Sequence, residues 1–75
     1  MSNETAAQVA ALKAFFEQQQ FPKSVVIGPA ETITDIPKFL DSHFHMIESY
    51  DDPKKFDVFL LRLIKLKEKL SQAAQ

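Results

Sequence analysis

Apolar side chains recur every three or four residues along three segments of this chain, which is the spacing of one face of an α-helix. Helices with such faces must bury them against one another. A chain of 75 residues can close one hydrophobic core but not two. The periodicity therefore predicts a single helical domain, residues 1–75, of the all-α class, built as a three-helix bundle.

The first helix is expected from about residue 5 to residue 20. Thr5 precedes Gln8 by three residues, the spacing of a capping box. Its apolar stripe consists of Val9, Leu12, Phe15 and Phe16. Phe21-Pro22 then ends the helix, because the residue before a proline disfavours helical backbone angles.

The connector between the first two helices, residues 21–35, is long and carries two prolines and the single glycine of the chain. Proline and glycine at this density exclude a helix. The β-branched run Val25-Val26-Ile27 predicts an extended piece, but one strand alone cannot satisfy its backbone hydrogen-bonding groups. We therefore expect this partly extended run to lie across the helices or to pair with another chain.

The second helix is expected from about residue 36 to residue 50. Asp35 can cap the N–H of Lys38, and Pro37 occupies a first-turn position where a missing N–H costs nothing. The predicted buried face consists of Ile36, Phe39, Leu40, His43, Ile47 and Tyr50. Its period matches that of an amphipathic helix packed on one side.

The third helix is expected from about residue 53 to residue 72, since Asp52 can cap it and Pro53 suits its first position. Its main stripe consists of Phe56, Phe59, Leu60, Leu63, Leu66 and Leu70. Lysines near its end suit the negative pole of the helix dipole. The sequence thus predicts one continuous helix for the last third of the chain.

Histidine is the first residue type to test for chemistry, and the chain has His43 and His45. Two residues advance a helix by about 200°, so these rings diverge and cannot hold one metal ion. We interpret His43 as a hydrogen-bonded core histidine in preference to a ligand or catalytic group. We interpret His45 as an exposed residue in contact with Asp41 or Glu48, in preference to a weak metal site.

Other catalytic patterns are weaker still. The absence of cysteine removes disulfides, thiolate zinc sites and cysteine nucleophiles, and one glycine cannot form a phosphate-binding glycine-rich loop. Asp41-Ser42-His43 cannot converge as a triad from one helix, and Asp51-Asp52 suits helix capping better than acid–base chemistry. We therefore predict that the protein is not an enzyme and has no catalytic residue, metal site or cofactor.

Apolar residues beyond the needs of a three-helix core indicate an interaction surface. The candidate residues are Val25, Val26, Ile27, Val58, Leu61 and Ile64. Exposed apolar patches of this kind mark sites of protein association. The first hypothesis is therefore a small protein-interaction module that binds an unknown protein or a second copy of itself, as in a homodimer.

The alternative hypothesis is nucleic-acid binding, because six of the nine basic residues lie from Lys54 onward. The candidate basic face consists of Lys54, Lys55, Arg62, Lys65 and Lys69. Such a stripe can contact phosphates, but a net charge of −1 and the lack of accompanying base-reading amides favour a solvated helix face. A weaker third hypothesis is the capture of a small ligand between the connector and the helices.

The location predicted from the sequence is cytoplasmic, without membrane contact. Met1-Ser2-Asn3-Glu4 lacks the basic start and apolar stretch of a signal peptide. The longest apolar runs are much shorter than the roughly 20 residues that cross a bilayer as a helix.

Several motifs spread along nearly the whole chain resemble a known family. They are Phe15-Phe16, Phe21-Pro22-Lys23, the segment 33–39, Ser42-His43 and Arg62-Leu63 with Leu66. This pattern is similar to an uncharacterised family of short bacterial proteins of the Bacteroidetes type, known only as a domain of unknown function. The resemblance implies no activity, cofactor or catalytic residue. It implies that the turn at 22–23, the cap at 34–35 and His43 are features of the fold.

Overall fold

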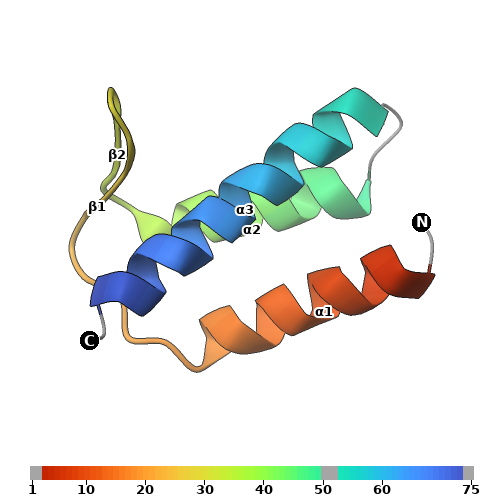
Figure 1. The fold of residues 1–75 in the computed structure, drawn as a ribbon, viewed down its shortest axis with the longest axis horizontal. Helices are drawn as coiled ribbons and strands as arrows, with labels where there is room; N and C mark the ends of the chain where they lie inside the picture. The colour runs from red at the N-terminus through yellow and green to blue at the C-terminus, as the bar shows by residue number, and fades with distance from the viewer. Residues whose placement is uncertain (1–2, 50–52, 74–75) are drawn as a thin grey trace.

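The part of the chain that the structure describes folds into three helices and one two-stranded hairpin (Figure 1). The structure is a computed structural model that describes residues 3–49 and 53–73. The helices are α1 (Asn3–Glu17), α2 (Ile36–Glu48) and α3 (Pro53–Ala73), and the strands are β1 (Val25–Gly28) and β2 (Glu31–Ile33). The prediction of an all-α class is therefore wrong, because the domain is α+β.

The hairpin is where the sequence reading failed. β1 pairs with β2 in antiparallel fashion, with Val25 opposite Ile33 and Val26 opposite Thr32. The extended run thus finds its partner within the same chain, across a turn at residues 29–30, and not on another chain as the sequence reading allowed. Ile27 and Ile33 are buried and Val26 and Thr32 are exposed, which is the alternation of a strand with one covered face.

The helix boundaries lie close to the predicted ones. α1 begins at Asn3, so Thr5 lies inside its first turn, and α1 ends three residues earlier than expected. The cap of α2 is confirmed: Asp35 Oδ1 accepts a hydrogen bond of 3.1 Å from the backbone N–H of Lys38. The predicted cap at Asp51-Asp52 and the predicted core position of Tyr50 lie outside the described residues.

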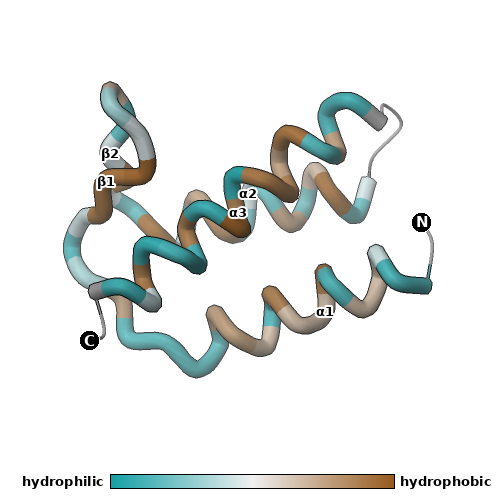
Figure 2. The backbone as a smooth tube through the Cα atoms, viewed as in Figure 1, coloured by the Kyte–Doolittle hydropathy of each residue, from teal (hydrophilic) through white to brown (hydrophobic). Residues whose placement is uncertain are grey.

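The hydrophobic core is built around α3, which packs against α1, α2 and β1. Apolar residues recur along each helix and along β1, as Figure 2 shows. The buried apolar residues are Val9, Leu12, Phe16, Ile27, Ile33, Ile36, Leu40, Ile47, Phe56, Leu63, Leu66 and Leu70. The helical members of this set were predicted from periodicity, and only the two hairpin isoleucines were not.

The elements are arranged so that α2 and α3 lie together and α1 runs beside them (Figure 1). The hairpin lies at the end of the molecule where α2 begins, near the C-terminal end of α3. It is short, and a two-stranded hairpin is marginal on its own. Burial of Ile27 and Ile33 against the helices therefore stabilises it.

Candidate functional site

A polar network joins the hairpin to both α2 and α3, and Arg62 of α3 is at its centre. The guanidinium of Arg62 binds the carboxylate of Glu31 on β2 with two nitrogens, and the Nη1–Oε1 distance is 2.8 Å. Its Nε donates a 3.0 Å hydrogen bond to Nε2 of His43 on α2. Three elements of the fold, β2, α2 and α3, therefore meet at one side chain.

His43 is bonded at both ring nitrogens. Nδ1 lies 2.8 Å from the backbone carbonyl oxygen of Phe39, which can only accept, so Nδ1 carries the proton. Nε2 is then the acceptor that Arg62 requires. The ring is 8% exposed and stacks on Phe39 at a centroid distance of 3.8 Å, while the ring of Phe59 meets it edge-on. The predicted hydrogen-bonded core histidine is confirmed.

The electrostatics of the network favour a neutral histidine beside an ion pair. Burial lowers the pKa of His43, and the charge of Arg62 lowers it further, against the opposing effect of the Phe39 carbonyl. Hydrogen bonds from Arg62 lower the pKa of the Glu31 carboxyl. The same bonds raise the pKa of Arg62. In the network, Arg62 and Glu31 are therefore charged, and His43 is neutral.

This geometry does not suit catalysis at His43. Both ring nitrogens are engaged, and a general base or a metal ligand needs a free lone pair. Within residues 3–49 and 53–73, no group of three or more acidic, histidine or cysteine side chains could hold a metal ion. The arrangement is suited instead to fixing the hairpin on the helices.

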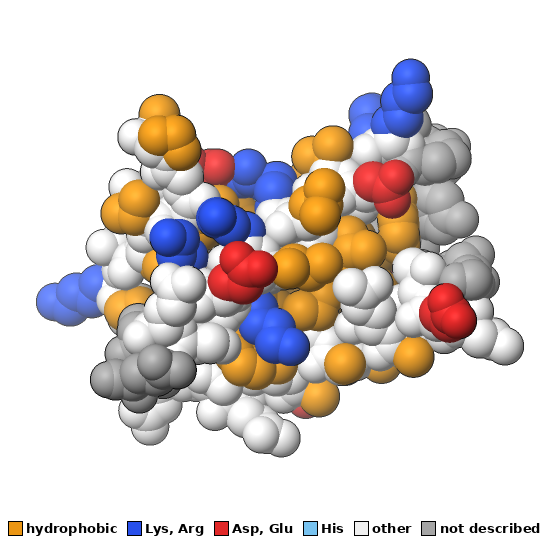
Figure 3. All heavy atoms as spheres, viewed as in Figure 1, with side chains coloured by type: hydrophobic (Ala, Val, Ile, Leu, Met, Phe, Trp, Pro, Cys, Tyr) orange, Lys and Arg blue, Asp and Glu red, His pale blue; other side chains and the backbone are white. Residues whose placement is uncertain are grey.

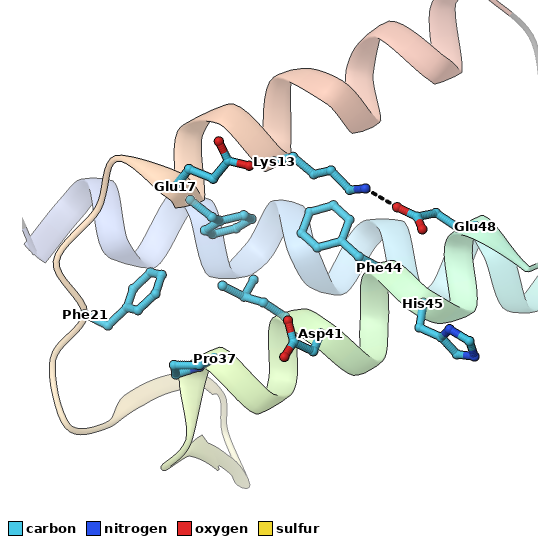
Figure 4. A pocket seen from close by; sticks show the side chains of 10 residues that line it. Lys13, Glu17, Phe21, Pro37, Asp41, Phe44, His45 and Glu48 are labelled. Carbon is cyan, nitrogen blue, oxygen red and sulfur yellow. Dashed lines mark hydrogen bonds and ion pairs between the residues drawn. The ribbon is translucent and has the colours of Figure 1, made fainter.

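A groove between α1 and α2 is the main concave feature that we consider as a binding site (Figure 4). It has a volume of about 600 Å³. Its apolar lining includes Phe16 of α1, Phe21 of the connector and Phe44 of α2. Lys13 of α1 pairs with Glu48 of α2 across it. The connector therefore helps to form a pocket with the helices, where the sequence suggested small-ligand capture as the weakest of three hypotheses.

The comparison with protein families is decided by one match. The family model described as a domain of unknown function, DUF6965, matches residues 7–72. The chain belongs to this family. No curated protein and no solved structure matches the chain. The match covers the polar network and the groove of this DUF6965 domain, and it carries no function for either.

The candidate interaction surface does not lie in one place. Val58 and Leu61 of α3 are 54% and 64% exposed, and Val26 on the outer face of the hairpin is 58% exposed. Ile27, by contrast, is a buried core residue of the DUF6965 domain. Val25 and Ile64 are half-buried against the core. The exposed part of the set is therefore a pair on α3 and a separate residue on the hairpin.

The candidate basic face is reduced by the polar network. Lys54, Lys55 and Lys65 are exposed and Lys69 is half-buried. Arg62 is engaged with Glu31 and His43. The carboxylate that neutralises Arg62 comes from Glu31 of the hairpin.

His45 is exposed as predicted, but the expected contact with Asp41 or Glu48 is not seen among the described residues. The Glu48 carboxylate binds Lys13 instead. The sequence reading missed this pair and missed Glu31 as well, because each contact joins residues more than 30 positions apart. Helical periodicity carries no signal for such contacts.

None of the helices in the described part of the DUF6965 domain is long and apolar enough to pass through a membrane.

Proposed function

We propose that the domain is a small, non-catalytic protein-interaction module that uses the outer face of α3. The observation that supports this most is the exposure of Val58 and Leu61, 54% and 64%, on a helix whose opposite face is already buried. They are three residues apart and therefore neighbours on the helix surface. Figure 3 shows hydrophobic side chains at the surface over the N-terminal half of α3, the half that carries this pair.

The spacing along α3 adds a preference for partner type. Lys65 is four residues from Leu61, so it follows the apolar pair along one side of the helix. Apolar contact then supplies affinity, and Lys65 favours an acidic surface. The partner is an unknown protein or a second copy of this chain in a homodimer. The proposal includes a cytoplasmic location and, from the resemblance, a bacterial source.

The test is the oligomeric state and its dependence on Leu61. Sedimentation at tens of micromolar should show self-association that Leu61→Asp abolishes, because a buried carboxylate without a partner is costly at an interface. Ala10→Asp, at an exposed position of α1, is the matched control and should leave the mass unchanged. If the partner is another protein, affinity capture from the native cell should lose it with Leu61→Asp alone.

The proposal fails if the chain is a strict monomer and no captured protein depends on Leu61. It also fails if Leu61→Asp and Ala10→Asp behave alike in both measurements. Since both positions are exposed, neither substitution is expected to unfold the domain.

Nucleic-acid binding is the second candidate, and it is supported by Lys55, Lys65 and Lys69 on the basic face of α3. It ranks lower because Arg62 already has a carboxylate partner. A generic DNA or RNA probe should shift at low salt and release as salt rises, and Lys65→Glu should weaken the complex. No shift at low salt, or an unaffected Lys65→Glu variant, counts against this function.

A further inference from the structure

The groove between α1 and α2 has the size and lining of a small-molecule site. Its volume of about 600 Å³ lies within the range of roughly 300–1,000 Å³ that is usual for ligand pockets. Phe16 and Leu40 in its lining are buried. The rings of Phe21 and Phe44 reach it from the connector and from α2 (Figure 4). A ligand with an aromatic or alkyl body can therefore bury that body here.

The charged residues that line the groove determine whether it favours a positively or a negatively charged ligand. Among the described residues, Lys13 and the imidazole of His45 are the basic groups in its lining, and Lys13 is neutralised by Glu48. Glu17 of α1 and Asp41 of α2 remain, one on each wall (Figure 4). Within the described ranges neither carboxylate has an ion-pair partner. The groove thus favours a cation and repels an anion.

The groove already holds one ammonium group of its own in this way. Lys13 Nζ binds the Glu48 carboxylate and lies 5.5 Å from the centre of the Phe44 ring. A carboxylate beside an aromatic face is a favourable setting for an amine. Asp41, Glu17 and Phe21 supply the same two components in the rest of the groove.

We propose that the groove between α1 and α2 binds a small organic cation, a protonated amine carried on an aromatic or short alkyl body. The apolar body contacts the phenylalanine lining, and the ammonium group lies between Glu17 and Asp41. This site is distinct from the outer face of α3, whose exposed residues Val58 and Leu61 do not line it.

The experiment compares two probes of similar shape and opposite charge. A ¹⁵N-labelled sample is titrated with 2-phenylethylamine and, separately, with 3-phenylpropionate at neutral pH and low salt. The amine should give saturable shifts of backbone amides in 13–21 and 37–48, the segments that line the groove. The carboxylate probe should give no such shifts, and added salt should weaken the binding of the amine.

Two matched substitutions locate the charge. Asp41→Asn removes one carboxylate charge from the groove, and the dissociation constant for the amine should rise about two- to fivefold, as for a partly exposed ion pair. Glu68→Gln makes the same change on the exposed side of α3 and should leave the constant unchanged. The spectra of both variants report directly that the fold is intact.

Three outcomes overturn the proposal. The first is the absence of saturable shifts up to tens of millimolar amine, or equal shifts with the two probes. The second is an Asp41→Asn variant that binds the amine as the unaltered chain does. The third is movement of the same amides on dilution without any probe, which would assign the groove to a second copy of the chain.

Discussion

At the scale of single residues, His43 has bonds at both ring nitrogens that only one protonation state allows. The neutral ring donates to the carbonyl of Phe39 and accepts from Arg62. A second proton on the ring would point an N–H at the N–H of Arg62, and two donors repel. The contact between α2 and α3 at this point therefore depends on pH.

We predict that, over the range from pH 7.5 to pH 5, the domain loses stability once the pH falls below about 6.5. Because burial lowers the pKa of His43 below its ordinary value of 6.5, the unfolded chain takes up a proton before the folded one does. The contribution of His43 to the free energy of unfolding is complete above about pH 6.5. Below that pH it falls by at most about 1.4 kcal/mol per pH unit. Urea unfolding across this range measures the effect.

His45→Gln is the control and should keep the same pH dependence, since that side chain is exposed and takes no part in the hydrogen bonds of His43. His43→Gln should be less stable at pH 7.5 and should lose the dependence. The Glu31 carboxyl, with its pKa lowered from 4.5, affects stability only at more acidic pH. A slope unchanged by His43→Gln would refute the assignment to this ring.

Arg62 provides a second prediction at this scale. Arg62→Met keeps much of the apolar stem but leaves Nε2 of His43 without a donor, and such a loss costs about 1–3 kcal/mol. Glu31→Gln should cost less, because its carboxylate is partly exposed and His43 keeps its bond. Urea unfolding of both variants at pH 7.5 tests the order. Equal losses would mean that the ion pair, and not the histidine bond, carries the effect.

At the scale of elements, α3 shows two opposite environments within half a turn. Leu63 is fully buried at 0% exposure, whereas Leu61 is 64% exposed. Leu61 and Leu63, two residues apart on α3, therefore have different roles. The inner one belongs to the core, and the outer one is free for the interaction proposed above.

We predict that Leu63→Ala destabilises the domain by about 2–5 kcal/mol, as expected for a leucine removed from a packed core. Leu61→Ala should change stability by no more than about 0.5 kcal/mol. Leu63→Met, which nearly conserves volume, should cost less than about 1.5 kcal/mol and keeps the measurement possible if Leu63→Ala unfolds the chain. Denaturant midpoints give all three values. Similar losses at 61 and 63 would contradict the burial described here.

The hairpin is the element most dependent on its surroundings. Its strands have four and three residues, and it is attached through Ile27, Ile33 and the hydrogen bond that Arg62 donates to Glu31. A hairpin of this length does not persist in water without such contacts. It is therefore a part of the core and not an appended loop.

At the scale of the whole molecule, α1, α2 and β1 all pack on α3, so the domain has one shared core. We predict that Ile33→Ala lowers stability by about 2–5 kcal/mol and that helix and hairpin signals are lost in the same transition. Far-UV circular dichroism and hairpin amide resonances, followed in urea, should give coincident curves. Hairpin resonances that vanish well before the helical signal would show that the hairpin folds separately.

The sequence by itself determined the three helices, their buried faces, the Asp35 cap and the burial of His43. Each of these is signalled by a pattern within a few residues of the chain, for which a period of 3.6 and capping chemistry suffice. The pairing of β1 with β2 could also have been predicted from the sequence, since a second β-branched stretch follows the turn. The prolines in the connector led us to predict a single extended run instead.

Only the tertiary structure decided which surfaces are free and which are engaged. The sequence reading placed Arg62 in the candidate basic face. In the structure its charge is neutralised by the carboxylate of Glu31, which lies 31 residues away in the chain. The groove between α1 and α2 likewise exists because both helices lie against α3 while Phe21 reaches them from the connector. Such features depend on how elements pack side by side in space, and helical periodicity describes each element only along its own axis.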